Sequence, residues 1–270
     1  MRRKQPLIFG IVNITEDSFS DGGRYLETAD SLEHGRRLHQ TGADVLDLGA
    51  RASNPDSEPV SPSEEIRRLA PLIAAFQKEK IPLSIDSFSG EVQRYAIENN
   101  IDYLNDIQGF PDSSIYPLIA SSHCKLIVMH SIDGLEKATR REMEPREVEE
   151  SVYKFFDLRL QELILAGIDP DRLILDPGMG FFLGSKPEAS IHILKIISKI
   201  KERYAMPLMV SVSRKSFLGA ITGRSVDKRS VATAVAELIA LSRGTDMIRT
   251  HEPSGTIDAM RISSALGAEF

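Results

Sequence analysis

The chain has 270 residues, of which 41% are hydrophobic and 27% are charged, and its 39 Asp and Glu against 33 Lys and Arg give a formal net charge of −6. This composition excludes a disordered chain, and the single Cys124 excludes a disulfide framework and a cysteine-rich zinc site. Because the charge is mildly acidic and the sequence shows neither a membrane-span run nor a signal-peptide core, we expect a cytoplasmic protein without nucleic-acid or membrane partners.

Short apolar runs recur along the chain, rich in Ile, Val and Leu and bounded by Gly, Pro, Asp or Ser. Runs of this kind are typical of strands that are buried on both faces of a parallel sheet. In chain order the predicted strands are Leu7–Ile14, Val45–Gly49, Pro82–Asp86, Tyr103–Ile107, Lys125–His130, Arg172–Asp176, Leu208–Ser213 and Met247–His251.

Longer amphipathic stretches lie between these runs. In Glu64–Lys78 the apolar residues recur at intervals of three and four, with Glu and Arg on the opposite face, which predicts a helix. The same pattern predicts helices at Thr28–Gln40, Gly90–Glu98, Pro145–Ala166, Pro187–Arg203, Lys228–Ser242 and Ser254–Leu266, with a shorter one at Ser113–Ser122.

The alternation of strands and helices predicts the fold. Eight consecutive strand–helix units in about 250 residues are the content of a (β/α)8 TIM barrel. A doubly wound open sheet is the alternative, because periodicity alone does not show that a sheet closes. No linker, low-complexity tract or internal repeat divides the sequence, so we predict that residues 1–270 form a single domain.

Polar and ionisable side chains follow nearly every apolar run. Parallel α/β folds carry their active sites at the carboxyl ends of the strands, so these side chains should converge on one mouth of the barrel. A single Asp or Asn there is more often a turn former or a helix cap, whereas several at one level favour a functional site. The residues at that level are Asp86, Asn105, Asp176, Lys215, Arg249 and His251.

These side chains divide by charge into two expected surfaces. Lys215, Arg249 and His251 come from the last two loops, where barrels often bind phosphate, and an Arg offers phosphate a planar fork of donors. Asn13 offers a hard oxygen to Mg²⁺, which usually arrives bound to substrate phosphates. The carboxylates and the amide can clamp a flat heterocycle that carries N–H donors. We therefore predict an acidic slot for a polar ring beside a cationic site for a phosphate.

Several strand ends belong to longer motifs. Residues 13–23 read Asn-x-Thr-x-Asp-Ser-Phe-Ser-Asp-Gly-Gly, a highly specific string, and the other motifs are Ser84–Ser87, Asn105–Ile107, Met129–His130, Leu175–Gly178, Ser213–Phe217 and Arg249–His251. In this order, over almost the whole chain, they resemble the dihydropteroate synthase family. The resemblance implies a pterin-binding barrel that joins 4-aminobenzoate to 7,8-dihydropterin-6-ylmethyl diphosphate and releases diphosphate with the help of Mg²⁺. It also implies a homodimer formed through helices opposite the active mouth.

The resemblance further implies a role for each matching residue. The pterin would be held by Asp86, Asn105, Asp176 and Lys215. The diphosphate would be held by Asn13, Arg249 and His251, with Asn13 also on the metal. The aminobenzoate site would be shaped by Ser53, Pro55, Phe182 and Ser216. The expected catalytic groups stabilise a pterin cation and the departing diphosphate, and they are Asp86, Asp176, Lys215, Arg249 and His251.

Two loops depart from the usual pattern of the family. The second loop, Gly49–Asp56, has Ser53 and Asn54 where the family usually has Thr and Arg, and a lengthened sixth loop brings in Phe182. Both departures resemble the mobile sulfonamide-resistance form of the enzyme. An aromatic insert would admit planar aminobenzoate and clash with the bulkier sulfonamide group, so we predict a sulfonamide-insensitive site.

The residues leave three alternatives open. A pterin-dependent methyltransferase domain would share the barrel and the acidic slot, but it would need a cobalamin partner and not both cationic loops. A Schiff-base aldolase would use Lys215, although the neighbouring Arg214 and Ser216 suit anion binding as well. A non-catalytic pterin-binding protein would have no need of the phosphate-side residues.

Overall fold

All eight predicted strands are present in the structure, a computed structural model that describes residues 5–14, 21–51, 59–134 and 141–267, with 21–27 described by their backbone alone. The strands form one parallel sheet in the order β6-β5-β4-β3-β2-β1-β8-β7. They are β1 (Leu7–Asn13), β2 (Val45–Gly49), β3 (Leu83–Asp86), β4 (Tyr103–Asp106), β5 (Lys125–Met129), β6 (Leu173–Asp176), β7 (Met209–Val210) and β8 (Met247–Thr250).

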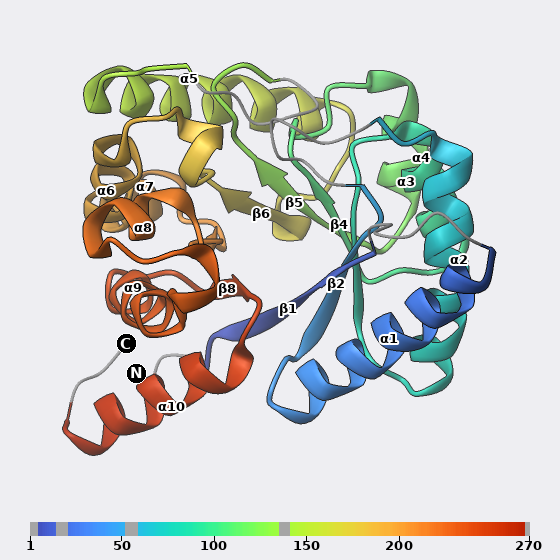
Figure 1. Cartoon of the computed structure of the whole chain (residues 1–270). Helices are drawn as coiled ribbons and strands as arrows, with labels where there is room; N and C mark the ends of the chain where they lie inside the picture. The colour runs from blue at the N-terminus through green and yellow to red at the C-terminus, as the bar shows by residue number, and fades with distance from the viewer. Residues whose placement is uncertain (1–4, 15–20, 52–58, 135–140, 268–270) are drawn as a thin grey trace.

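The two outer strands of that order, β6 and β7, meet and close the sheet. Leu175 and Leu208 form a parallel bridge, and the backbone N–H of Leu175 donates to the carbonyl of Pro207 at 2.9 Å. Because β7 spans only two residues, this seam is shorter than the other strand pairings. The closed sheet confirms the predicted (β/α)8 TIM barrel and not the doubly wound alternative (Figure 1).

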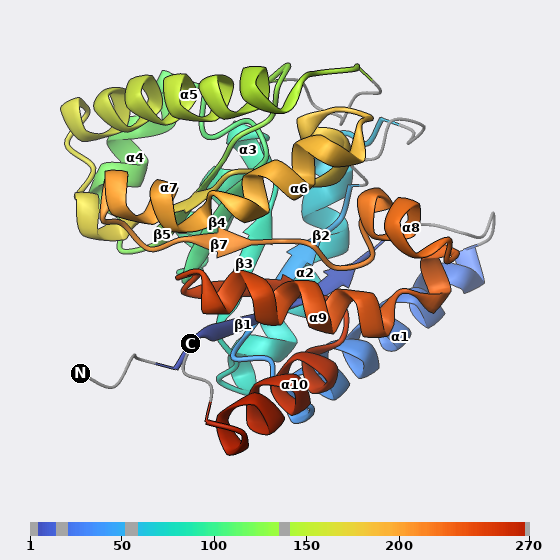
Figure 2. The same cartoon turned by 90° about the vertical axis from the view of Figure 1, so that its left-hand side faces the viewer.

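Helices surround the barrel, and a large apolar core lies between them and the strands (Figures 1 and 2). They are α1 (Asp21–Gln40), α2 (Pro62–Lys78), α3 (Gly90–Glu98), α4 (Tyr116–Ser121), α5 (Pro145–Leu165), α6 (Pro187–Lys195), α7 (Ile197–Tyr204), α8 (Ser216–Thr222), α9 (Ser230–Ser242) and α10 (Pro253–Ala265). Single 3₁₀ turns are η1 (Ser113–Ile115), η2 (Pro170–Arg172), η3 (Gly180–Leu183) and η4 (Val226–Lys228). Within the described ranges, no helix has the length and apolarity that crossing a bilayer requires.

Several helices differ from the sequence expectation, and the first, α1, begins at Asp21 and not at the predicted Thr28. The predicted helix at Pro187–Arg203 is broken at Ile196, whose ψ of 10° lets both Ile196 and Ile197 turn into the core, where they are 5% and 0% exposed. Helix α8 was not predicted, because its seven residues span only about two turns and so give little periodic signal.

The interior of the barrel changes from apolar to polar along the strands. One buried cluster fills the lower interior with Phe9, Val45, Tyr103, Ile127, Ile174, Met209 and Met247. Because side chains alternate across a strand, the residue two positions further along also points inward, one layer higher. On these strands, or directly after β7 in the case of Ser211, that upper layer holds Ile11, Asp47, Asn105, Met129, Asp176, Ser211 and Arg249. The carboxyl ends of the strands therefore open onto a charged floor.

Candidate active site at the mouth of the barrel

Arg249 lies at the centre of this charged floor. Its Nε lies 2.5 Å from Oδ2 of Asp47, and its Nη2 lies 2.6 Å from Oδ2 of Asp86. Strand β1 lies between β8 and β2, so the guanidinium reaches past β1 to carboxylates of β2 and β3. Burial lowers the pKa of Arg249, but the two carboxylates raise it further, so the side chain stays charged.

Three further ionisable groups at the mouth have pKa values shifted toward neutrality. Burial raises the pKa of Asp86 to about 7, with Arg249 opposing and Asp47 adding to the shift. Burial likewise raises the pKa of Asp176 to about 6, although the N–H of Gly178 donates to its Oδ1 at 2.8 Å. Burial and the charge of Arg249 lower the pKa of Lys215 to about 8. Groups poised near neutral pH in a hollow are typical of a functional site.

Some buried polar atoms of this floor have no protein partner within the described ranges. Asn105 Nδ2 donates to Asp47 Oδ2 at 3.4 Å. Three other atoms have no hydrogen-bond partner among the described residues, and they are Asn105 Oδ1, Asp47 Oδ1 and the hydroxyl oxygen of Ser84. All three residues are at most 3% exposed. Because buried polar groups are nearly always paired, these atoms remain for the donors and acceptors of a ligand.

The expected cationic surface differs from the structure in two respects. His251 is neutral, because burial and the charges of Arg249, Arg214 and Lys215 lower its pKa to about 3. Arg249 is bonded to Asp86, which was expected to belong to a separate slot, and also to Asp47. The predicted acidic slot and the predicted cationic site are therefore one network. The side chain of Arg249 is long enough to reach β2 and β3, and the sequence does not show how far these strands lie from β8.

Asn13 ends β1 with an exposed side chain beside this network. A Cβ built on Gly49 would lie 3.8 Å from both Asn13 Oδ1 and Asp86 Oδ2, so the two side chains flank this glycine. Across the described part of the chain, no cluster of three or more His, Cys, Asp and Glu could hold a metal ion. The amide oxygen of Asn13 suits a hard cation only if other oxygens, such as those of a phosphate, complete its shell.

Phe182 lies in η3, where its ring faces Lys215. The Lys215 Nζ lies 5.0 Å from the ring centroid, and Phe182 is 7% exposed. Two glycines allow this approach: a Cβ at Gly178, with φ of 76°, would meet the His130 carbonyl at 2.3 Å, and Gly180 has φ of 67° beside the Lys215 side chain.

The remaining predicted aminobenzoate residues are Ser216, Ser53 and Pro55. Ser216 is half-buried and begins α8 directly after Lys215. Ser53 and Pro55 lie outside the described residues.

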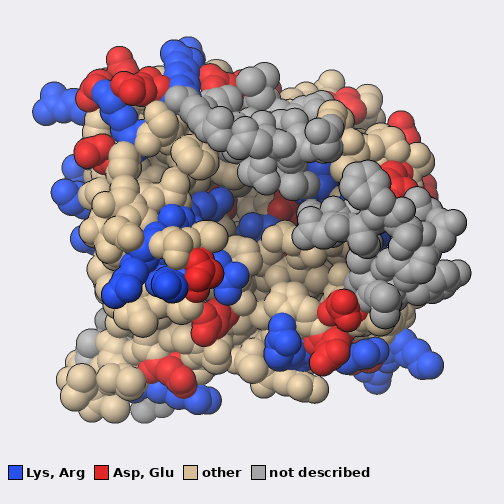
Figure 3. Space-filling view, in the orientation of Figure 1, with Lys and Arg blue, Asp and Glu red and all other residues tan. Residues whose placement is uncertain are grey.

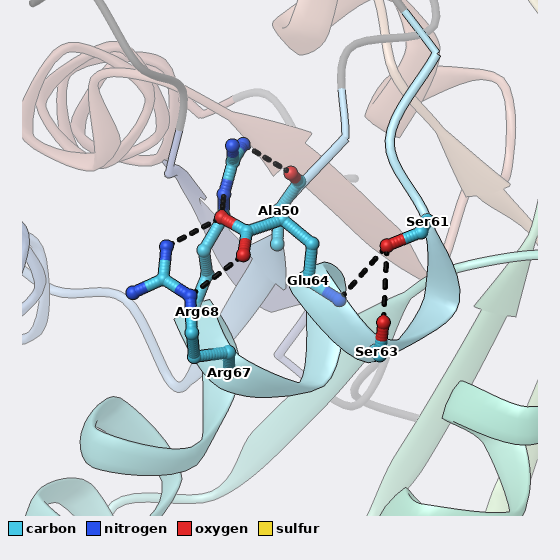
Figure 4. Close-up of polar contacts among 6 residues, drawn as sticks. All are labelled: Ala50, Ser61, Ser63, Glu64, Arg67 and Arg68. Atoms are coloured by element: carbon cyan, nitrogen blue, oxygen red, sulfur yellow. Dashed lines mark hydrogen bonds and ion pairs between the residues drawn. The ribbon is translucent and has the colours of Figure 1, made fainter. Parts of the chain in front are cut away.

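The second loop leaves the barrel from a fixed base. Arg68 donates to the Ala50 carbonyl at 3.2 Å and to Glu64 at 2.7 Å (Figure 4). Hydrogen bonds from Arg67 and Arg68 hold the pKa of Glu64 at about 2. Next to Ala50, Arg51 lies 3.8 Å from the buried carboxylate of Glu65 and packs over the Phe88 ring.

Asp47 belongs to the site, although it is not among the site residues predicted from the sequence. The signal that would have found it is alternation, since Asp47 lies two positions after the inward-facing Val45. Figure 3 shows basic and acidic side chains together in the hollow at the centre of this face.

Comparison with known proteins agrees on one family. A family model described as "Pterin binding enzyme" matches residues 9–251. The chain is 51% identical to the dihydropteroate synthase type-3 of Escherichia coli, covering 96% of this chain and 99% of that protein, and 49% identical to the type-2 enzyme of the same species, covering 97% of each. The solved structure of the Xanthomonas albilineans dihydropteroate synthase with 4-aminobenzoic acid superposes with a TM-score of 0.88 at 32% identity, covering 98% of this chain and 94% of that one.

Proposed function

The chain belongs to the pterin-binding enzymes and, within them, to the dihydropteroate synthases, and from this premise we propose how its side chains divide the work. The enzyme is a transferase of folate biosynthesis that condenses 7,8-dihydropterin-6-ylmethyl diphosphate with 4-aminobenzoate to give 7,8-dihydropteroate and diphosphate. The observation that carries the assignment of roles is the contact of Arg249 with Asp47 and Asp86 on the charged floor. A methyltransferase or a non-catalytic binding protein is not favoured, because the relatives matched over the whole chain are synthases.

The pterin ring would lie on the charged floor, held by Asp86, Asn105, Asp176 and Lys215. Support comes from the buried Oδ1 atoms of Asn105 and Asp47, which have no partner among the described residues and can accept the N–H groups of the ring. Lys215 would donate to a ring acceptor. The carboxylates also offset positive charge that develops on the ring during reaction.

The diphosphate would lie on the opposite side of Arg249, against His251 and Asn13. Arg249 supplies charge and a planar fork, while the neutral His251 supplies a hydrogen-bond donor. Asn13 would hold Mg²⁺ through its amide oxygen, with the diphosphate completing the shell, and the ion would neutralise charge on the leaving group.

In the reaction the bond between the methylene carbon and the diphosphate oxygen breaks, and the electron pair leaves with the diphosphate. The amine nitrogen of aminobenzoate attacks the methylene and then loses a proton to water. Arg249 and His251 stabilise the departing charge, and Asp86 and Asp176 stabilise the cation left on the pterin. Because the electrophile is strong, the scheme needs no nucleophilic side chain and no strong base.

Aminobenzoate would enter between Phe182, Ser216 and the second loop with Ser53 and Pro55. The Phe182 ring packs against Lys215 and would therefore narrow the aminobenzoate site. A sulfonamide, whose sulfonyl group extends beyond the plane of aminobenzoate, would clash with the ring there. We therefore propose that this enzyme discriminates against sulfonamides.

A second copy of the chain is the proposed partner. Val231, Val235 and Ile239 recur at intervals of four on α9 and are 79%, 53% and 40% exposed. Helix α9 runs along the flank of the barrel, not opposite its mouth (Figure 2). A homodimer would cover the apolar stripe that this helix carries. We further propose that residues 1–270 make one pterin-binding domain and that the enzyme is cytoplasmic, consistent with its free, buried Cys124.

The test is release of diphosphate from the purified enzyme given the pterin diphosphate, 4-aminobenzoate and Mg²⁺. We expect diphosphate and dihydropteroate in equal amounts, and loss of activity on chelation that added Mg²⁺ restores. Product formation that persists undiminished without Mg²⁺ would contradict the metal role of Asn13, and absence of diphosphate release would contradict the proposal as a whole.

A further inference from the structure

The loop between β7 and α8, which carries Lys215, contains a residue in a left-handed conformation. Arg214 directly precedes Lys215 and has a φ of 58°. For a residue other than Gly this conformation costs free energy, because the Cβ crowds the backbone. Such a conformation persists only where the surrounding structure holds the backbone in place.

Two side chains from the start of α9 hold the backbone of Arg214 at both of its polar groups. The hydroxyl oxygen of Thr233, which is 4% exposed, accepts from the Arg214 N–H at 3.1 Å. The Nη1 of Arg229 donates to the Arg214 carbonyl at 2.9 Å and to the Lys215 carbonyl at 3.3 Å. The direction in which the chain enters Lys215 is thus fixed from α9.

The guanidinium of Arg229 lies across α8, which packs beside α9 (Figures 1 and 2). Its Nε donates to the Arg224 carbonyl at 3.0 Å, so the side chain spans α8 from the loop before it to the turn after it. Gly219, in the middle of α8, allows this approach, since a Cβ there would lie 2.2 Å from Nη2 of Arg229.

The side chain of Lys215 extends from this fixed backbone toward η3. Its stem packs on Gly180, where a Cβ would lie 3.1 Å from Lys215 Cδ, and its Nζ lies 5.0 Å from the centroid of the Phe182 ring. A rotation of the backbone at Arg214 would carry the stem away from Gly180. The position of the ammonium therefore depends on the φ of the residue before it.

We propose that Arg229 is a positioning residue that holds Arg214 in the left-handed conformation and so directs the Lys215 ammonium onto the charged floor. The inference rests on the pterin role of Lys215 proposed above. Arg229 acts through the backbone and not through contact with a substrate. Arg214→Gly introduces a residue that adopts positive φ without strain, so it should make the hold of Arg229 dispensable.

The experiment is a double-mutant cycle that combines Arg229→Ala with Arg214→Gly. In the wild-type background Arg229→Ala should lower kcat/KM for the pterin diphosphate roughly tenfold, because the ammonium is misplaced. In the Arg214→Gly background the same substitution should lower it by less than about threefold, since Gly keeps the left-handed φ. Each effect is measured against its own background, so loss of the Arg214 side chain does not enter the comparison.

The pKa of Lys215 is a second readout, which does not depend on catalysis. It is measured from the NMR shift of the Lys215 Cε, assigned by its absence in Lys215→Arg. Burial is the main cause that lowers this pKa to about 8, so release of the ammonium in Arg229→Ala should raise it toward its ordinary value of 10.5. In the double variant with Arg214→Gly it should stay near 8.

Arg172→Ala is the matched control. Arg172 directly precedes β6, at the end of the barrel opposite the mouth. Its guanidinium also donates to three backbone carbonyls, those of Ile119 at 2.8 Å, Ala120 at 3.3 Å and Cys124 at 2.8 Å. This variant should lower Tm and leave both kcat/KM and the pKa of Lys215 unchanged.

Gly219→Ala tests the same contact with Arg229 retained. The added Cβ displaces the guanidinium, while Ala favours a helix more than Gly does, so this variant serves if Arg229→Ala does not fold. It should raise the pKa of Lys215 and lower kcat/KM, each by less than Arg229→Ala does.

An unchanged pKa of Lys215 in Arg229→Ala, or in Gly219→Ala if the first does not fold, would overturn the inference whatever the rate. A loss of kcat/KM as large in the Arg214→Gly background as in the wild type would also overturn it, and so would an equal rise of the pKa in Arg172→Ala. A raised pKa with an unaltered kcat/KM, together with an unaltered kcat/KM in Lys215→Met, would instead overturn the pterin role of Lys215.

Discussion

The guanidinium of Arg249 and the carboxylate of Asp86 meet at 2.6 Å, although the two residues are 163 positions apart in the chain. In the proposed scheme Asp86 binds the pterin and Arg249 binds the diphosphate, so one ion pair joins the two ends of the substrate's site. A pterin that forms hydrogen bonds with the carboxylate of Asp86 weakens the ion pair between Asp86 and Arg249. The Arg249 guanidinium is then free to bind the diphosphate. Binding of the ring and of the leaving group should therefore be coupled through this pair.

Replacement of Asp86 tests the charged floor. We expect Asp86→Asn to lower kcat by about a hundredfold, because the charge that stabilises the pterin cation is lost. Its thermal stability should not fall, since burial raises the pKa of Asp86 to about 7, which makes its charged form costly, and Arg249 keeps its contact with Asp47.

A matched control for this variant is Asp106→Asn. Asp106 accepts from the N–H groups of Gln108 at 2.7 Å and Phe110 at 3.1 Å, on the face of β4 opposite Asn105. This variant should lower Tm and keep kcat. Full activity in Asp86→Asn would contradict the assignment of the floor.

The pKa of Lys215 predicts the alkaline limb of the pH profile. Because burial and Arg249 lower this pKa to about 8, the ammonium is charged below pH 8 and neutral above it. If the charged form binds the pterin, kcat/KM for the pterin diphosphate should fall as the pH rises through about 8. In Lys215→Arg the limb should disappear below pH 10, and a limb that remains at pH 8 in this variant belongs to another group.

Phe182 is expected to determine the response to sulfonamides. Phe182→Ala should lower the sulfonamide Ki by roughly tenfold or more, because removal of the ring opens the site beyond the plane of aminobenzoate. The KM for aminobenzoate should change little. The adjacent Phe181→Ala, which alters a partly exposed ring outside the Lys215 contact, should leave the Ki unchanged. Equal Ki values for wild type and Phe182→Ala would remove this explanation of discrimination.

His130 predicts a pH dependence of stability. The Nδ1 atom of His130 lies 3.2 Å from the Pro177 carbonyl oxygen, and its Nε2 atom lies 2.9 Å from Ser151 Oγ. Burial lowers the pKa of His130 from 6.5 to about 4. Between pH 4 and pH 6.5 the histidine binds a proton in the unfolded chain but not in the folded chain. The contribution of neutral His130 to the free energy of unfolding is therefore present above pH 6.5 and is lost as the pH falls toward 4.

Denaturant titration of wild type and His130→Asn at two pH values measures this contribution. At pH 7 the free energy of unfolding of His130→Asn should be lower than that of the wild type. This difference should shrink by about 2 kcal/mol at pH 5, because only the wild type loses the stabilisation that comes from the lowered pKa of His130. A deficit that is the same at both pH values would show that His130 does not titrate in this way.

The stripe on α9 predicts how the oligomer can be broken. Val235→Asp places a charge in the centre of the stripe and should convert a dimer into a monomer in sedimentation experiments. Leu165→Asp is the matched control, because Leu165 on α5 is equally apolar and 79% exposed but lies on another helix. A dimer that survives Val235→Asp would rule out α9 as its centre.

Much of this molecule could be predicted from its sequence, because strand ends are marked by a change from apolar runs to polar residues. That change identified Asp86, Asn105 and Asp176 as site residues without any knowledge that the sheet closes into a barrel. The contact of Arg249 with Asp47 could not be predicted, since it depends on which strands are neighbours and on the reach of one side chain past β1. The neutral state of His251 was also missed, because burial and nearby charges exist only in the folded chain.

The short seam between β6 and β7 has a consequence for how this enzyme can evolve. The barrel is joined there by the Leu175–Leu208 bridge, whereas β1, β2 and β3 are linked by longer ladders. The loops that carry Phe182 and Lys215 leave the barrel on either side of that seam. Changes in those loops therefore lie far from the longer ladders that hold Asp47 and Asp86 in place. Selection by a drug can thus reshape the wall that carries Phe182 while the β2 and β3 part of the substrate-binding floor is left intact.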